Sequence, residues 1–207
     1  MSQRHNGGHR GSVDETRRRI AVEAARLIAE DGLRDYHDAK RKAALRLGIG
    51  DDAALPRNGD IEEALREHQR LFQSATQPAH LARLRRTAID AMRFLARFEP
   101  RLVGAVLEGT ADAHSTVHLH LFCDDPREVT TALADQRIPY EEKTRTLRSD
   151  SGRDEDHLAL LLGADGVPVE LTLFEVDDLR QAPLDRVTSK PMRRARLASV
   201  EILVEQT

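Results

Sequence analysis

The sequence predicts an α+β protein, with a helical N-terminal region followed by a small mixed sheet with flanking helices. Two changes of period along the chain support this class. Through the first half, apolar residues recur at the three- and four-residue spacing of amphipathic helices. After Pro100 they occur in short runs or alternate with polar residues, as in strands, and a helical spacing returns near the C-terminus.

The chain is long enough for two structural units. It has 207 residues, of which 40% are hydrophobic and 32% charged, enough for one good core or two small ones. We expect a disordered tail over residues 1–14, which are rich in Gly, Ser, Arg and His and show no period. A helical region is then expected over 15–76, and the sheet-containing domain over 77–207.

Composition also restricts the class of protein. No apolar run approaches the length of a membrane span, and the first residues are polar, so we expect a cytoplasmic protein without membrane contact. Cys123 is the only cysteine. It excludes an intrachain disulfide and a zinc site made of cysteines.

The two halves of the chain differ in the sign of their charge. Residues 15–98 hold 17 basic and 13 acidic side chains, whereas residues 99–207 hold 13 basic and 21 acidic ones. The simpler interpretation is docking between the two units, or solvated surfaces. The alternatives are a basic helical surface for nucleic acid and a protein partner bound through the N-terminal helices.

Four helices are expected before residue 100. Glu15–Glu30 and Tyr36–Leu47 have helical spacing and are followed by glycines that suit a helix end. A loop over Gly50–Gly59 precedes a third helix, which Asp60 begins as the first residue of a capping box. Pro78 suits the first turn of a fourth. Its predicted buried stripe is Leu81, Leu84, Ala88, Met92 and Leu95, with an arginine row on another face at Arg83, Arg86, Arg93 and Arg97.

The second half is expected to contain five strands and two helices. Val117, Leu119 and Leu121 alternate with polar residues, which indicates a strand with one buried face. The other predicted strands are Leu102–Leu107, Tyr140–Leu147, His157–Leu162 and Val167–Phe174. The predicted helices are Asp125–Ala134 and Pro191–Val204.

The segment between the first two predicted strands has residues suited to phosphate chemistry. Gly109 and Thr110 would form a tight turn in which the glycine lets a phosphate approach the backbone and the hydroxyl adds a hydrogen bond. His118 and His120 follow on one face of the next strand, because side chains alternate along a strand.

This order of elements resembles the DNA polymerase β-like nucleotidyltransferase superfamily, particularly its minimal members, over residues 78–175. The family signature is a Gly-Ser turn, two aspartates separated by one residue, and a third carboxylate on a later strand. Gly109-Thr110 matches the turn and Glu170 matches the third carboxylate. The resemblance implies a nucleoside triphosphate and Mg²⁺ as ligands. Uncharacterised bacterial proteins that carry such a domain after a helical leader are also similar.

The aspartate pair, however, is replaced by Thr116 and His118, or by His118 and His120. Neutral imidazoles are poor ligands for Mg²⁺. One interpretation is a pseudoenzyme that keeps a nucleotide pocket but has lost transfer. A second is a Zn²⁺ or Mn²⁺ site formed by His118, His120 and Glu170 that supports other chemistry. A third is that the histidines are polar residues on the solvent side of the sheet.

The N-terminal region suggests a different class of function. The segments Arg17–Gly32 and Tyr36–Leu47 resemble the first helices of tetracycline-repressor-like DNA-binding domains. The resemblance implies a helix-turn-helix regulator whose DNA affinity falls steeply with salt. This is the alternative to a nucleotidyltransferase-like protein.

Overall fold

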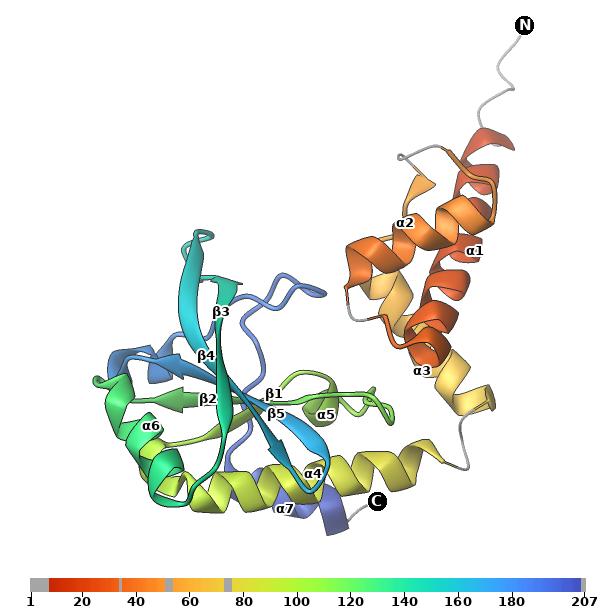
Figure 1. The fold of residues 1–207 in the computed structure, drawn as a ribbon. Helices are drawn as coiled ribbons and strands as arrows, with labels where there is room; N and C mark the ends of the chain where they lie inside the picture. Colours follow the sequence, from red (N-terminus) through yellow and green to blue (C-terminus); the bar gives the residue numbers. More distant parts are fainter. Residues whose placement is uncertain (1–7, 34, 51–53, 73–75, 206–207) are drawn as a thin grey trace, which may run out of the picture. The chain divides into compact units, whose positions relative to one another are not determined.

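The computed structural model describes residues 8–33, 35–50, 54–72 and 76–205. The chain divides into two compact units. The first comprises residues 1–74 with 186–188, and the second comprises residues 75–185 and 189–207. The protein has the expected α+β architecture, with a helical N-terminal region and a five-stranded mixed sheet in its described part (Figure 1).

The helical unit contains α1 (Gly8–Asp31), α2 (Tyr36–Arg46) and α3 (Asn58–Phe72). Its core forms where Ile20 and Leu27 of α1 meet Ala43 of α2 and Ile61 of α3, all fully buried. The small alanines of α2 let its backbone approach α1 closely, which suits a helical unit with few large side chains. Burial of such apolar surface supplies most of the stability of short helices.

Two helix starts differ from the sequence prediction. Residues 8–14 are helical rather than part of a tail, because α1 begins at Gly8, and residues 1–7 of that predicted tail lie outside the described residues. Extending an existing helix adds one hydrogen bond per residue fixed, so the helix continues beyond its apolar stripe. The third helix begins at Asn58, and Asp60 lies inside its first turn, where its carboxylate accepts the Arg57 amide at 2.8 Å.

The sheet has the strand order β1-β2-β5-β4-β3. Only the β2–β5 pair is parallel among the described strands; β1–β2, β5–β4 and β4–β3 are antiparallel. The strands are β1 (Arg101–Val103), β2 (Val117–Phe122), β3 (Tyr140–Arg148), β4 (Asp154–Ala164) and β5 (Val167–Phe174). The β3–β4 hairpin therefore lies at one edge, and its outer strand β3 is largely exposed.

Helices cover one face of this sheet (Figure 1). They are α4 (Gln77–Phe94), α6 (Pro126–Asp135) and α7 (Leu197–Glu205). The five residues of the predicted α4 stripe are all buried against the apolar side chains of β2 and β5. Asp125 caps α6 by accepting the Arg127 amide at 2.9 Å. Short 3-10 turns, η2 (Ala96–Phe98) and η3 (Val176–Arg180), follow α4 and β5.

The predicted strand over Leu102–Leu107 is split in the structure. β1 ends at Val103, Gly104 turns the backbone with φ 72° and ψ −156°, and α5 (Ala105–Glu108) follows. A short apolar run fits a buried strand or a buried helical turn equally well, which is why period alone did not separate them. Near the C-terminus α7 begins at Leu197 because the backbone of Ala195 pairs with Leu102 in both directions at 2.9 Å, which keeps it extended.

The arginine row of α4 is mainly used for contacts within the second unit. The Arg83 side chain donates to the Asp165 carbonyl at 2.6 Å, and that of Arg97 to the Glu128 carbonyl at 2.9 Å. Arg93 pairs with Glu201 of α7 at 2.7 Å. These arginines thus connect α4 to neighbouring loops and helices through hydrogen bonds and an ion pair. In the residues that the structure describes, no helix combines the length and apolar character needed to cross a bilayer.

Candidate functional site

The face of the sheet that α4 does not cover carries the polar side chains of β2 and β5. Because β2 and β5 are parallel neighbours in register, His118 stands directly beside Glu170. The His118 Nδ1 lies 3.1 Å from Glu170 Oε1, and their side chains are 28% and 13% exposed. The sheet register therefore fixes this pair, which brings together two of the predicted site residues.

Arg145 joins the pair from the edge strand β3. Its Nε lies 3.7 Å from the same Glu170 Oε1, and its side chain is 39% exposed. In the register of the sheet, β4 lies between them and presents the small, buried Ala159 beside Thr172, so a long side chain has room to cross. Within the described residues, the terminal nitrogens of Arg145 make no other ion pair or hydrogen bond.

The charges around Glu170 hold its carboxyl in the ionised form. The hydrogen bond with His118 lowers the pKa of Glu170 most; burial opposes this, and the nearby charges of Arg145 and Lys143 lower it further. Lys143 also lies 3.4 Å from Glu141 on the exposed surface of β3, where such pairs contribute little energy. A carboxylate bonded in this way accepts hydrogen bonds and is less available to a metal ion.

The second ring nitrogen of His118 is unengaged. In the part of the chain that the structure describes, Nε2 has no hydrogen-bond partner, whereas Nδ1 contacts Glu170. The backbone of Gly104 passes this edge of the ring, and a Cβ on Gly104 would lie 3.8 Å from His118 Cδ2. The partly exposed imidazole can therefore meet a ligand through Nε2.

His120 has a different environment on the same face. The residue is 2% exposed, and the Arg194 Nε donates to its Nδ1 at 3.1 Å, so Nε2 carries the proton. Burial lowers the pKa of His120 well below its usual value, and the charge of Arg194 lowers it further. We therefore interpret His120 as a neutral structural residue.

Arg194 closes this half of the face. Its guanidinium lies 4.9 Å from the ring centres of Phe122 and Phe174 and donates to the carbonyl oxygens of Asp178 and Gln181. Burial lowers the pKa of Arg194 to about 10. Among the described residues, its Nη2 is the one buried side-chain nitrogen or oxygen without a partner. The segment that carries Arg194 thus covers His120 but leaves the His118 pair partly open.

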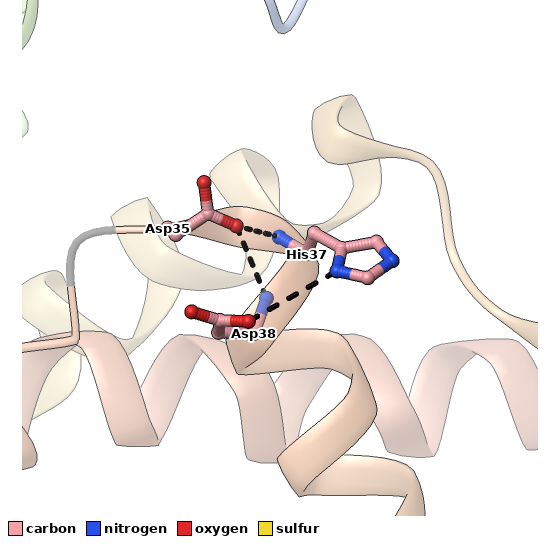
Figure 2. Close-up of side chains that lie close together, drawn as sticks. All are labelled: Asp35, His37 and Asp38. Carbon is pink, nitrogen blue, oxygen red and sulfur yellow. Dashed lines mark hydrogen bonds and ion pairs between the residues drawn. The ribbon is translucent and has the colours of Figure 1, made fainter.

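The ligand atoms of the three predicted metal ligands, His118, His120 and Glu170, do not lie together as a group. The described residues contain one group of three side chains whose ligand atoms all lie within 4.8 Å of one another, and it is Asp35, His37 and Asp38 in the helical unit. The Asp35 carboxylate accepts hydrogen bonds from the backbone amides of His37 and Asp38, whose donor–acceptor distances are 2.7 and 3.1 Å; Figure 2 draws these contacts as dashed lines. Asp35 is the N-cap of α2, and this capping is a sufficient structural role for its carboxylate.

Gly109 and Thr110 also lie in a different setting from the one predicted. They follow the helical turn α5 instead of a strand. The Gln77 side chain of α4 donates to the Gly109 carbonyl at 2.9 Å, and a Cβ on Gly109 would lie 3.8 Å from the Arg85 side chain. The glycine at the end of β1, beside His118, is Gly104.

An open, shallow hollow lies at one end of β3, β4 and β5. It has a volume of about 470 Å³, and its lining includes Tyr140, Leu161, Gly163 and Pro168. Leu161 pairs with Glu170 in the register of β4 and β5, but His118, Arg145 and Glu170 do not line the hollow.

The sequence reasoning missed Gly104, Arg145 and this hollow. The alternation of Lys143 and Arg145 along β3 was a signal that both face one side, but the strand order was needed to bring them to Glu170. Comparisons of the chain with protein-family models, with curated proteins and with solved structures found no match in any of the three.

Proposed function

We propose that the sheet-containing unit binds a phosphorylated ligand, with a nucleoside triphosphate as the first candidate, beside Glu170. The observation that carries this proposal is the arrangement of Arg145. Its Nε side is held against Glu170, its terminal nitrogens have no other partner among the described residues, and His118 contacts the same carboxylate oxygen. A guanidinium presented in this way suits two oxygens of a phosphate group.

A nucleoside triphosphate is the first candidate because the order of elements resembles that of the nucleotidyltransferase superfamily. The hollow near Tyr140 does not supply a site for its base. Tyr140 pairs with Leu162, which pairs with Val169 of the face that α4 covers, so the Tyr140 side chain and Arg145 lie on opposite faces of the sheet.

The same residues give little support to two-metal nucleotidyl transfer. That chemistry uses several carboxylates to hold Mg²⁺ against the triphosphate. Here Glu170 is engaged by His118 and Arg145, and histidines occupy the strand positions where the family resemblance predicts aspartates. The proposal is therefore a nucleotidyltransferase-like domain that binds its ligand without that metal pair.

Titration calorimetry tests this proposal with ATP, inorganic triphosphate and phosphate, each with a chelator and then with Mg²⁺, Mn²⁺ or Zn²⁺. We expect ATP to bind in the presence of the chelator. Arg145→Gln should weaken ATP and triphosphate about tenfold or more, since a hydrogen bond to a charged group contributes about 1.5–3 kcal/mol.

Arg153→Gln is the matched control, because Arg153 is an arginine near the turn of the same β3–β4 hairpin and contacts Ser151 at 3.2 Å. The Arg153→Gln variant should bind ATP with the same affinity as the unmodified protein. If ATP, inorganic triphosphate and phosphate all fail to bind, both with and without metal, the proposal is refuted.

The helical unit gives less support to the DNA-binding alternative. In a helix-turn-helix the two helices are joined by a turn of about 3–4 residues. Here α2 ends at Arg46 and α3 begins at Asn58, and residues 51–53 of the connection lie outside the described residues. The prediction of a protein partner through these helices stays a prediction.

A further inference from the structure

We infer that the segment carrying Arg194 is a strap that acid releases: protonation of His120 breaks its hydrogen bond with Arg194 and lets the strap leave the polar face of the sheet. The strap is formed by residues 181–185 and 189–195. Its release does not depend on the ligand binding proposed above. The released state exposes the aromatic side chains of β2 and β5 that the Arg194 guanidinium covers in the closed state.

The backbone of the strap is attached to the two outer strands of the sheet. The Leu184 amide donates to the Arg148 carbonyl of β3 at 2.7 Å. The Ala195 backbone exchanges two hydrogen bonds with Leu102 of β1, both at 2.9 Å. The inner strand β2 is instead reached by a side chain of the strap, that of Arg194.

Arg194 depends on His120 for its hydrogen bond to the sheet. Its Nε donates to His120 Nδ1 at 3.1 Å, whereas its Nη1 donates to carbonyl oxygens of η3 and of Gln181, which belong to the layer that covers the sheet. Among the described residues its Nη2 has no partner. Without the His120 bond, Arg194 keeps only its ring contacts with Phe122 and Phe174 on the sheet side.

Protonation of His120 turns this attraction into repulsion. The neutral ring accepts the Arg194 hydrogen bond on Nδ1, whereas an imidazolium carries a proton on both nitrogens and accepts none. Two cations would then face each other at 3.1 Å around a residue that is 2% exposed, where water screens charge poorly. A charged His120 and a closed strap therefore exclude each other.

The groups that face His120 from the strands do not compensate its charge. They are Arg101 of β1, His118 of β2, Arg145 of β3, His157 of β4, and the uncharged Thr172 and Phe174 of β5. Burial lowers the pKa of His120 most, followed by the charge of Arg194 and then by His118, His157 and Arg145.

The carboxylates of this region are bound to other cations. Glu99 lies 3.0 Å from Arg101, Glu170 lies 3.1 Å from His118, and the charge of Asp178 acts on Arg194. The usual pKa of histidine is 6.5, so below that pH the released state binds a proton that the closed state does not. Falling pH therefore favours release.

Amide hydrogen exchange measured by NMR at pH 7.5 and pH 5 tests the inference. The amides of Leu184 and Ala195 report the strap, because each donates to a strand in the closed state. After correction for the intrinsic rate at each pH, both should exchange roughly 30-fold faster at pH 5, as expected when release takes up one proton on a group whose usual pKa is 6.5.

The same spectra separate release of the strap from unfolding of the whole sheet. Leu119 and Leu121 lie in β2, between β1 and β5, and their amides should exchange only when the sheet unfolds. Local release predicts that the amides of Leu184 and Ala195 are at least about tenfold less protected than these at both pH values. Both measurements use the unmodified protein.

Two variants assign the proton. His120→Asn keeps an acceptor for Arg194 and does not titrate, so exchange from the strap should differ by less than about threefold between the two pH values. His157→Gln is the matched control, because the His157 ring packs 4.3 Å from that of Phe174 on the same face but makes no hydrogen bond with Arg194. It should keep the dependence of the unmodified protein.

Four results would overturn the inference. They are strap amides whose corrected exchange is the same at both pH values, strap amides as protected as those of Leu119 and Leu121, an undiminished pH dependence in His120→Asn, and its loss in His157→Gln. The last result would assign the proton to His157. None of these outcomes bears on the binding of a phosphorylated ligand at Arg145, which calorimetry tests separately.

Discussion

The two faces of the sheet contrast in what their side chains do. On β2, Val117, Leu119 and Leu121 point into the core under α4 and are fully buried. Between them, His118 and His120 point to the other face, where their partners are charged. One strand thus contributes apolar residues to the core through every second position and polar residues to the opposite face through the positions between them.

The polar face is itself divided into a closed and a partly open half. Arg194, Phe122 and Phe174 enclose His120, whereas His118 and Glu170 meet the solvent beside Arg145. Two histidines that are equivalent in the sequence pattern therefore have opposite roles in our interpretation. Burial and hydrogen-bond partners distinguish them, and the spacing does not.

The largest expected effect comes from removing a core side chain of β2. Leu119 is fully buried, so Leu119→Ala should lower the free energy of unfolding by about 2–5 kcal/mol, from lost transfer energy and a residual cavity. Urea unfolding followed by circular dichroism measures this. A loss below about 1 kcal/mol would mean that this face does not carry the stability we assign to it.

A smaller loss is expected at the turn beside the open half. Gly104 has φ 72° and ψ −156°, a region that residues with a side chain rarely adopt, so Gly104→Ala should cost about 1–3 kcal/mol. The new Cβ would meet His118 at an ordinary contact distance of 3.8 Å, so the cost is in the backbone. Thermal unfolding measures it.

Gly163→Ala is the control for this turn, because Gly163 lies in β4 without a positive φ and has open space around its Cβ position. It should be neutral or slightly stabilising. Equal losses in the two variants would argue that the conformation of Gly104 is not what requires a glycine there.

The closed half should give the protein a pH-dependent stability. The pKa of His120 lies below its usual value of 6.5 in the folded protein, so the unfolded chain binds more protons as the pH falls below 6.5. The stability that neutral His120 provides is present above pH 6.5 and is lost as the pH falls, by up to about 2 kcal/mol at pH 5.

His120→Asn should remove this dependence, because its amide oxygen can accept the Arg194 hydrogen bond and does not titrate. Urea unfolding at intervals from pH 7.5 to 5 compares the two proteins. Glu170 affects stability in another pH range. Its pKa is lowered from 4.5 in the folded protein, so the stability that the ionised carboxylate provides is lost only below pH 4.5. Parallel curves for both proteins between pH 7.5 and 5 would contradict the assignment to His120.

Much of the fold was predictable where the apolar period is long. The α4 stripe and the alternation of Val117, Leu119 and Leu121 were predicted correctly, because each repeats the period of its element several times. The run from Leu102 to Leu107 is too short for that, and it contains the end of β1, the Gly104 turn and the whole of α5.

The candidate site was predictable only in part, for reasons of geometry. His118 and Glu170 were singled out from residue type, and the register of β2 and β5 places them together. Arg145 reaches them because β4 presents Ala159 beneath its side chain, a fact of strand order that no local pattern contains. The burial of His120 likewise depends on Arg194, which lies 74 positions further along the chain.

The smallest expected effect is on the open half. His118→Asn keeps the hydrogen bond to Glu170, and Lys143→Gln changes an exposed side chain whose ion pair with Glu141 contributes little. Each should change the free energy of unfolding at pH 7.5 by less than about 0.5 kcal/mol, as usual for surface substitutions. Urea unfolding measures both, beside Leu119→Ala. A loss above about 1 kcal/mol in His118→Asn would show that this histidine stabilises the fold, and the contrast between the two faces would then not extend to it.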